Sequence, residues 1–129
     1  MSDPVVHFEM PYEDRDRMVR FYERVFAWKA QKLGPEMGNY VLVTTAETDV
    51  KPDAPRGAIN GGFWQKRSDR PAQVPALVIG VADIGASMRK VGEAGGEVLG
   101  EPMDIPGVGK YVSFFDTERN RVSLLQPLM

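Results

Sequence analysis

The stretch that decides the fold is VVHFEMPYEDRDRMVRFYERVFAW, residues 5–28. Side chains along a strand point alternately to its two faces. Residues 5–10 therefore have one apolar face, which consists of Val6, Phe8 and Met10. His7 and Glu9 lie on the opposite face. The pattern predicts a strand whose apolar face packs under a helix and whose other face carries a polar pair.

A helix is expected directly after this strand, over residues 14–27. Asp14 and Asp16 suit its N-terminus, where exposed amide groups and the helix dipole favour negative charge. Apolar residues then recur at helical spacing and form one stripe: Met18, Phe21, Tyr22, Val25 and Phe26. We expect this stripe to cover the apolar face of the strand.

Short strands are expected to complete this half of the chain. They lie at 28–33, 40–45 and 57–64, with a turn at Gly34-Pro35 and a polar loop over 46–56. Gly61 and Gly62 in the last strand indicate close approach of another backbone or of a ligand. Residues 65–73, which include several basic side chains, are interpreted as a solvated linker.

The same order of elements then restarts. A strand at 74–81 precedes a helix that Asp83 caps and Gly95-Gly96 ends. Three strands follow, at 97–100, 111–115 and 121–126, with a loop over 102–109 and a turn over 116–120. The predicted fold class is α+β: two tandem βαβββ modules that form a curved mixed sheet around a cavity. The modules, at about 4–64 and 74–127, make a single domain of residues 1–129.

Composition excludes several classes of function. The chain has 129 residues, a formal net charge of -2 and no cysteine. The lack of cysteine excludes disulfides, thiolate metal sites and a cysteine nucleophile. The charge balance argues against a nucleic-acid partner. No apolar run approaches membrane-spanning length and no signal peptide is visible, so we expect no membrane association and a cytoplasmic location.

Three motifs carry a family resemblance that covers nearly the whole chain. They are His7 through Trp28, Val81-x-Asp83 leading to Glu97, and the closing segment 115–120. On these motifs the chain resembles the vicinal oxygen chelate superfamily, which includes glyoxalase I, the bleomycin- and fosfomycin-resistance proteins and extradiol dioxygenases. The resemblance implies the fold given above, a small-molecule ligand in the cavity, and a homodimer.

The metal site of that family is poorly retained. Metal-dependent members offer a histidine or glutamate type of ligand from the first and last strands of each half. The resemblance places those positions at His7, Asn60 (or Gly61), Ala76 and Ser123. His7 is the only histidine in the chain, whereas a catalytic zinc site needs about three protein ligands. We therefore expect a subgroup that lacks most metal ligands and uses no cofactor; a divalent metal on His7 and Glu9 is the alternative.

The candidate site combines a polar pair with a partly apolar wall. The resemblance makes Glu9 and His7 the candidate catalytic residues, because a carboxylate that is removed from water suits a general base. The candidate substrate-binding residues are Asn60, Trp64, Val78, Ser123 and Leu125. In the structural interpretation, His7 and Glu9 form a hydrogen-bonded pair that fixes the strand, and Asn60 caps a neighbouring backbone group.

Several functions remain open at this level. The first is a metal-independent lyase or isomerase of the glyoxalase/bleomycin-resistance type, with Glu9 as the base. The second is a non-catalytic protein that sequesters a drug or metabolite. The third is a divergent metal-dependent lyase or dioxygenase that uses His7 and Glu9 as ligands. The fourth is a fold retained for contact with another protein.

Overall fold

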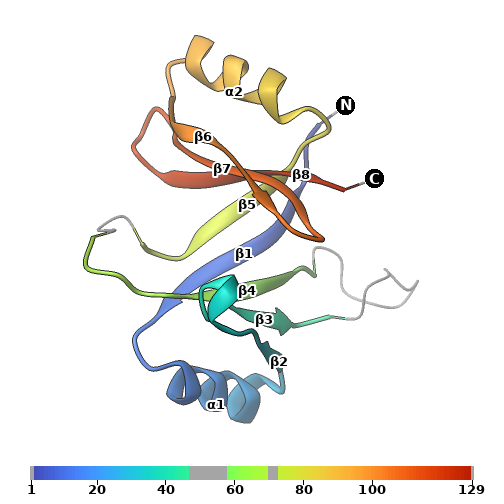
Figure 1. The fold of residues 1–129 in the computed structure, drawn as a ribbon, viewed down its shortest axis with the longest axis vertical. Coiled ribbons are helices and arrows are strands. Elements are labelled where there is room, and N and C mark those ends of the chain that lie inside the picture. The colour runs from blue at the N-terminus through green and yellow to red at the C-terminus, as the bar shows by residue number, and fades with distance from the viewer. Residues whose placement is uncertain (1, 47–57, 70–72, 129) are drawn as a thin grey trace. The chain divides into compact units, whose positions relative to one another are not determined.

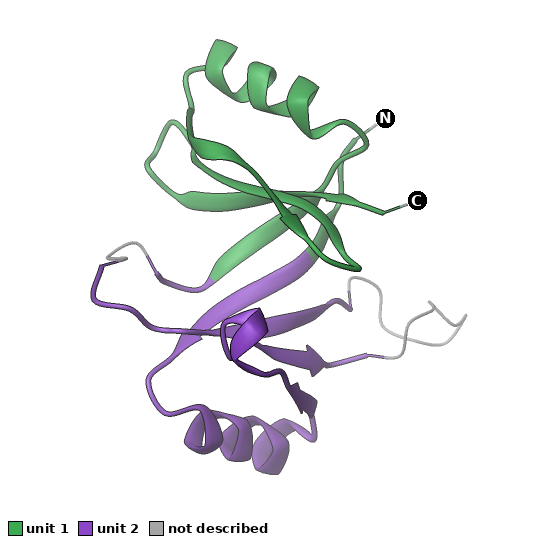
Figure 2. Cartoon of the chain, viewed as in Figure 1, with its two compact units in different colours: residues 1–6, 76–129 green, residues 7–75 purple. Residues whose placement is uncertain are grey.

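The computed structural model describes residues 2–46, 58–69 and 73–128. They form two compact units (Figure 2): unit 2 comprises residues 7–75, and unit 1 comprises residues 1–6 and 76–129. Within the described residues, neither α-helix is long and apolar enough to cross a membrane.

Unit 2 contains a helix and a mixed sheet (Figure 1). Its elements are β1 (Val5–Tyr12, which starts in unit 1), α1 (Arg15–Phe26), β2 (Lys29–Lys32), the 3-10 helix η1 (Pro35–Met37), β3 (Val41–Thr44) and β4 (Asn60–Gln65). The strands hydrogen-bond in the order β2-β3-β4-β1. β1 and β4 are parallel, whereas the other pairs are antiparallel. The predicted strand–helix–three-strand order is therefore confirmed for this half.

Helix α1 begins and ends where the sequence predicts. The Asp14 side chain caps the N-terminus by accepting a hydrogen bond from the Arg17 amide at 3.0 Å. Ala27 ends the helix in the left-handed conformation, with φ of 59°. The helix packs on the sheet over a core of Tyr12, Val19, Val41, Val43 and Phe63, with Phe8, Met10, Met18 and Tyr22 around it.

The predicted apolar stripe of α1 is only partly correct. Met18 and Tyr22 pack on the core, as does Val19, which the stripe omitted and which is 4% exposed. Phe21, Val25 and Phe26 are 53%, 56% and 57% exposed. The contact face is centred between residues 18, 19 and 22, so residues 21 and 25 fall on its flank. Three large apolar side chains are therefore left on the surface.

Unit 1 repeats the same order of elements. They are β5 (Ala76–Gly80), α2 (Ile84–Glu93), β6 (Glu97–Ile105), β7 (Gly109–Phe115) and β8 (Arg121–Pro127). The strands are ordered β5-β8-β7-β6, with β5 and β8 parallel and the others antiparallel. Asp83 caps α2 by accepting from the Ala86 amide at 3.0 Å. Together the two units confirm the α+β class and the repeated βαβββ module.

The core of unit 1 lies between α2 and one face of its sheet. It consists of Val81, Ile84, Val112, Phe114 and Leu124, with Ile79, Met88, Val91, Val98 and Val122 packed against it. All of these side chains are apolar, so the polar residues of β7 and β8 are left for the opposite face.

One predicted loop of unit 1 is wrong. The expected loop over 102–109 is mostly strand, because β6 continues to Ile105 and β7 begins at Gly109. A register shift between Leu99 and Met103 accommodates Pro102 within an edge strand, where the missing amide hydrogen is tolerated. What remains is a hairpin turn closed by the Val108 amide on the Ile105 carbonyl at 3.0 Å. The predicted loop over 46–56 lies, except for Ala46, outside the described residues.

Candidate functional site

The polar face of unit 2 is set by the packing of β1. Phe8 and Met10 pack on the core under α1, so His7 and Glu9 point to the other side of the sheet. β4 runs parallel to β1 with His7 opposite Asn60 and Glu9 opposite Gly62. Because partners in register project to the same side, these four positions share one face. Glu9 is only 6% exposed.

Tyr40 connects the two predicted catalytic residues. Its hydroxyl donates a hydrogen bond to Glu9 Oε2 at 2.9 Å and lies 2.9 Å from His7 Nε2. The three side chains thus form a chain in which the phenol stands between an imidazole and a carboxylate. The sequence did not single out Tyr40, which precedes β3 and is distant from β1 along the chain.

Gly62 makes room for this phenol. A Cβ atom on Gly62 would overlap the Tyr40 ring, and one on Gly61 would overlap the Phe8 ring. The two glycines indeed mark close approaches, but the approaching groups are side chains of the same unit rather than a backbone or a ligand. The glycine at 62 was therefore the sequence signal that could have led to Tyr40.

The hydrogen bonds of the Tyr40 hydroxyl indicate which nitrogen of His7 carries a hydrogen. The Tyr40 hydroxyl has one hydrogen, which goes to Glu9, so the contact with His7 requires a hydrogen on Nε2. Burial lowers the pKa of His7, and the attraction of Glu9 only partly offsets this effect. At neutral pH, His7 is thus a neutral imidazole in the tautomer that donates from Nε2.

The other candidate residues of unit 2, Asn60 and Trp64, lie on the same face of the sheet as His7 and Glu9. The Asn60 Oδ1 accepts hydrogen bonds from the Thr45 amide at 2.7 Å and the Ala46 amide at 3.0 Å. Its carbonyl therefore holds the end of β3, as the structural interpretation expects. Trp64 is in register with Pro11, two positions beyond Glu9, and so projects to the same side of the sheet.

The three candidates of unit 1 share the face opposite α2. Val78 is in register with Ser123, and Gly80 with Leu125, on the parallel strands β5 and β8. Ile79 and Leu124, the residues between them, pack in the core on the α2 side. Val78 and Ser123 are both buried.

Ser123 belongs to a chain of hydroxyl groups that the sequence did not reveal. The Arg121 Nη2 donates to Ser113 Oγ at 3.3 Å, Ser113 Oγ lies 2.8 Å from Ser123 Oγ, and Ser123 Oγ donates to the Tyr111 hydroxyl at 2.8 Å. Because Ser123 gives its hydrogen to Tyr111, Ser113 must donate to Ser123. The hydrogen bonds thus all run in one direction, from the positively charged Arg121 toward Tyr111. Hydrogen bonds arranged in such a series polarise one another. The sequence did contain one signal for this contact. A turn over 116–120 between two antiparallel strands pairs Ser113 with Ser123, as in the structure.

The residues at the family's metal positions do not fit a catalytic metal. His7 Nε2 donates to a phenol, Asn60 Oδ1 accepts two backbone amides, and Ser123 belongs to the hydroxyl chain. Ala76 has no ligating side-chain atom. Within residues 2–46, 58–69 and 73–128, no three histidine or acidic side chains group closely enough to hold a metal ion. These four positions therefore do not supply the three protein ligands that a catalytic zinc site uses.

Comparison with known proteins gives the family. The model of the Glyoxalase/Bleomycin resistance protein/Dioxygenase superfamily matches residues 5–124. The chain belongs to this superfamily. A glyoxylase-like domain-containing protein of Didymella fabae is 30% identical over 115 residues, which cover 87% of this chain and 84% of that protein. The resemblance found in the sequence is therefore confirmed.

Solved structures of methylmalonyl-CoA epimerases share the glyoxalase fold. One in complex with methylmalonyl-CoA and NH4+ is 17% identical with a TM-score of 0.72, covering 98% of this chain and 96% of that one. The enzyme from Mycobacterium tuberculosis is 13% identical with a TM-score of 0.70, covering 97% and 88%. A Streptomyces coelicolor variant in complex with 2-nitronate-propionyl-CoA is 16% identical with a TM-score of 0.71, covering 97% of each. At these identities the similarity is one of fold.

Proposed function

We propose that this glyoxalase-superfamily protein binds a small oxygenated organic molecule and moves a proton on it through Glu9, as a metal-independent isomerase or lyase. The observation that carries the proposal is the buried Glu9 carboxylate held by the Tyr40 hydroxyl beside a neutral His7. General bases in enzymes are commonly carboxylates that are removed from water and fixed by a hydrogen bond.

In this mechanism Glu9 takes a proton from a carbon next to a carbonyl group. The C–H bond breaks, its electron pair moves onto the carbonyl oxygen, and the carboxylate becomes a carboxylic acid. The proton on Glu9 exchanges with solvent, and return of a proton to the other face or to another atom gives the isomer. Loss of a leaving group with the electron pair gives the lyase outcome. Tyr40 is a positioning residue, because it acts on the substrate through Glu9.

His7 supports this arrangement from the other side of the phenol. Its Nε2 hydrogen fills a lone pair of the Tyr40 oxygen, so the phenol hydrogen is directed toward Glu9. A metal held by both His7 and Glu9 would need the phenol to leave and the imidazole to change tautomer. The geometry therefore favours the metal-independent function over the metal-dependent lyase or dioxygenase.

The fold comparison supports an acyl compound as the first substrate class to test. Several of the similar structures are of methylmalonyl-CoA epimerases, one of them with methylmalonyl-CoA bound. A carbon between acyl groups carries a hydrogen acidic enough for a carboxylate base. The substrate class and the chemistry of Glu9 are both part of the proposal.

The test is deuterium exchange in D2O, followed by proton NMR, on a panel of 2-substituted acids and acyl thioesters that includes methylmalonyl-CoA. We expect incorporation at the carbon next to the carbonyl, and a loss of about 100-fold or more in Glu9→Gln, the usual size of a general-base contribution. Glu36→Gln is the matched control, because Glu36 is an exposed carboxylate of the same unit. Equal exchange in wild type and Glu9→Gln would contradict the proposal. Tight binding without exchange would instead favour the sequestering protein.

A further inference from the structure

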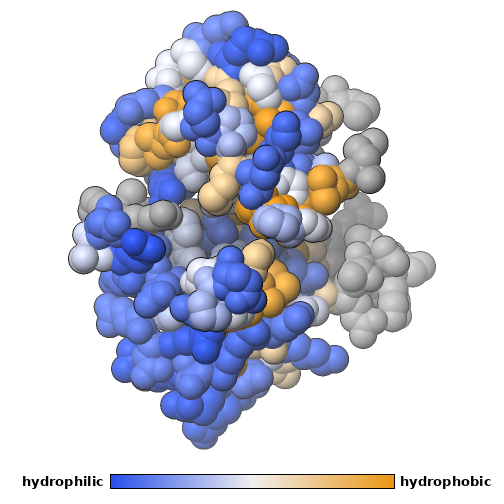
Figure 3. Space-filling view, in the orientation of Figure 1, coloured by the Kyte–Doolittle hydropathy of each residue, from blue (hydrophilic) through white to orange (hydrophobic). Residues whose placement is uncertain are grey.

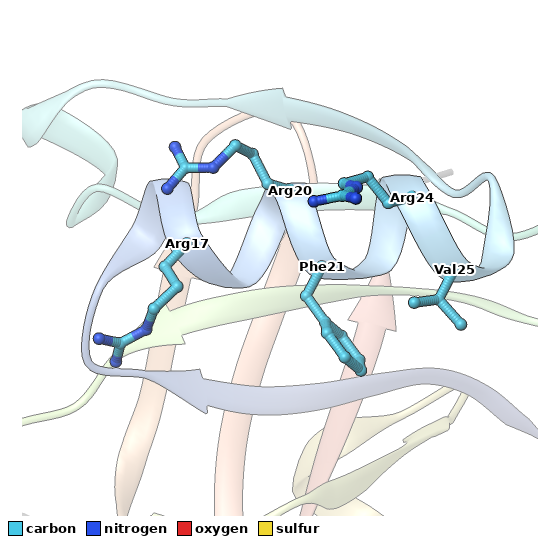
Figure 4. Close-up of a pocket in the computed structure, with 5 residues that line it drawn as sticks. All are labelled: Arg17, Arg20, Phe21, Arg24 and Val25. Atoms are coloured by element: carbon cyan, nitrogen blue, oxygen red, sulfur yellow. The ribbon is translucent and has the colours of Figure 1, made fainter.

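The outward side of α1 has an unusual surface for a helix that packs on a sheet. Phe21 and Val25, one turn apart, are both more than half exposed. Arg17, Arg20 and Arg24 alternate with them along the helix, and Figure 4 shows all five side chains projecting from α1. The area over α1 that is visible in Figure 3 is mostly hydrophilic. Phe21, Val25 and the three arginines thus form one strip of the helix, which does not include the exposed Phe26.

This strip lines a groove. The five side chains border a depression of about 390 Å³. A neighbouring depression of about 440 Å³ is bordered by Arg17 and Phe21 again and extends past Met18 to Lys66. Because the two depressions share Arg17 and Phe21, a segment laid along α1 can contact both. All of these residues belong to unit 2, so the groove is complete within it.

The first depression is positively charged, because its only charged side chains are Arg17, Arg20 and Arg24. The second has mixed charge, since Glu13 and Asp14 line it together with Arg17 and Lys66. In the part of the chain that the structure describes, Arg17, Arg20 and Arg24 form no salt bridge. Two carboxylates near the helix N-terminus pair with lysines: Asp16 with Lys32 at 2.6 Å, and Glu13 with Lys66 at 3.2 Å. Lys32 and the neighbouring arginines also lower the pKa of Asp16. Although Asp16 attracts Arg20 electrostatically, an incoming carboxylate would displace no salt bridge from the three arginines among the described residues.

The corresponding helix of the other module lacks this surface. α2 occupies the same place in its βαβββ unit, yet Met88 and Val91 pack on its core and no large apolar residue of the helix is exposed. It carries Arg89 without a large exposed apolar residue on the same helix. The combination of charged and exposed apolar side chains is therefore not a property of the module itself, and apolar side chains rimmed by polar ones are the composition of many interaction sites.

We propose that this groove docks a short acidic segment of another protein, with an apolar side chain against Phe21 and Val25 and carboxylates on the three arginines. Arg17 and Arg24 are seven positions apart, which is about 10 Å along a helix axis. Carboxylates seven residues apart on a partner helix, or three apart on an extended partner, span the same length. Arginine binds carboxylates through two parallel hydrogen bonds, which makes acidic side chains the matching ligand. The proposal is independent of the reaction assigned to Glu9.

The experiment selects peptides from a random displayed library on the full-length protein and measures the enriched peptides by fluorescence anisotropy. We expect acidic residues spaced around one aromatic or leucine residue. We also expect at least tenfold weaker binding to Arg20→Glu/Arg24→Glu and to Phe21→Ser, and weakening as salt is raised. The matched controls are Arg89→Glu on α2 for charge and Met103→Ala, another exposed apolar residue, for the apolar contact. Both should bind as the wild type does.

Three outcomes would overturn the proposal. The first is no enrichment, or enriched peptides whose affinity is the same for Arg20→Glu/Arg24→Glu and wild type. The second is binding to phosphatidylserine vesicles that the double variant loses, because the groove would then serve an anionic membrane surface. The third is a dimer in light scattering that Phe21→Ser dissociates, because the face would then belong to a second copy of this chain. Circular dichroism of each variant separates loss of binding from loss of folding.

Discussion

Removal of one hydroxyl group from unit 2 tests the polar chain directly. In Tyr40→Phe the ring keeps its place over Gly62, but Glu9 loses the donor at 2.9 Å and His7 loses its acceptor at 2.9 Å. A hydrogen bond to a charged group contributes about 1.5–3 kcal/mol, and a buried group left unsatisfied costs a similar amount. We expect the free energy of unfolding to fall by about 2 kcal/mol. With a typical urea dependence of about 2 kcal/mol per molar, the midpoint falls by about 1 M.

Two other tyrosines of the same unit are controls. The Tyr12 hydroxyl donates to the Asn39 carbonyl at 2.7 Å, which is a neutral bond, so Tyr12→Phe should cost about 1 kcal/mol. The Tyr22 hydroxyl forms no hydrogen bond with a described residue, and its ring stacks on Trp28 with centroids 4.6 Å apart. Tyr22→Phe should therefore change stability by less than about 0.5 kcal/mol.

The assay is urea unfolding followed by tryptophan fluorescence, with the double variant Tyr40→Phe/Glu9→Gln completing a cycle. Because the hydroxyl and the carboxylate interact, the double variant should be more stable than the sum of the two single effects predicts, by about 1 kcal/mol or more. A midpoint of Tyr40→Phe equal to that of Tyr22→Phe, or additive effects in the cycle, would refute the hydrogen-bonded chain.

Three further predictions concern pH and packing. Burial lowers the pKa of folded His7 below the usual 6.5. The contribution of His7 to the free energy of unfolding should therefore be constant above pH 6.5 and fall below it by up to about 1.4 kcal/mol per pH unit. His7→Gln should remove this pH dependence in urea titrations. Gly62→Ala should cost about 1–3 kcal/mol by displacing the phenol, whereas Gly92→Ala, with nothing within 4 Å, should stabilise α2 in thermal unfolding. Ser113→Ala and Ser123→Ala should each lower the free energy of unfolding by about 1–3 kcal/mol, and the double variant should lower it by less than their sum. Additive effects would show that the two hydroxyl groups do not interact.

Local patterns made the scaffold predictable. The alternation of β1 separates Phe8 and Met10 from His7 and Glu9 in the structure as in the sequence. The two aspartate caps place the starts of both helices, because capping depends only on residues within one turn. The repeat of the module follows from the same local signals.

The long-range contacts were not predictable in the same way. Tyr40 reaches Glu9 because η1 and β3 return the chain across β4, and only the absence of a side chain at Gly62 hinted at the contact. Helical periodicity predicted a wider buried stripe than the sheet covers, so Phe21 and Val25 were assigned to the interior. Periodicity specifies which residues share a face but not how much of that face a neighbour covers.

The interruption of β6 also has a consequence for self-association. β6 ends the strand order of unit 1, and a regular edge strand offers its free amides and carbonyls to any other strand that approaches. Here Pro102 has no amide hydrogen to offer, the register shift between Leu99 and Met103 breaks the regular repeat, and Glu101 and Asp104 add exposed negative charge. These are the devices by which natural sheets resist edge-to-edge aggregation. The irregularity that concealed this strand in the sequence thus disfavours edge-to-edge pairing between copies of the folded chain, the contact through which fibrils form.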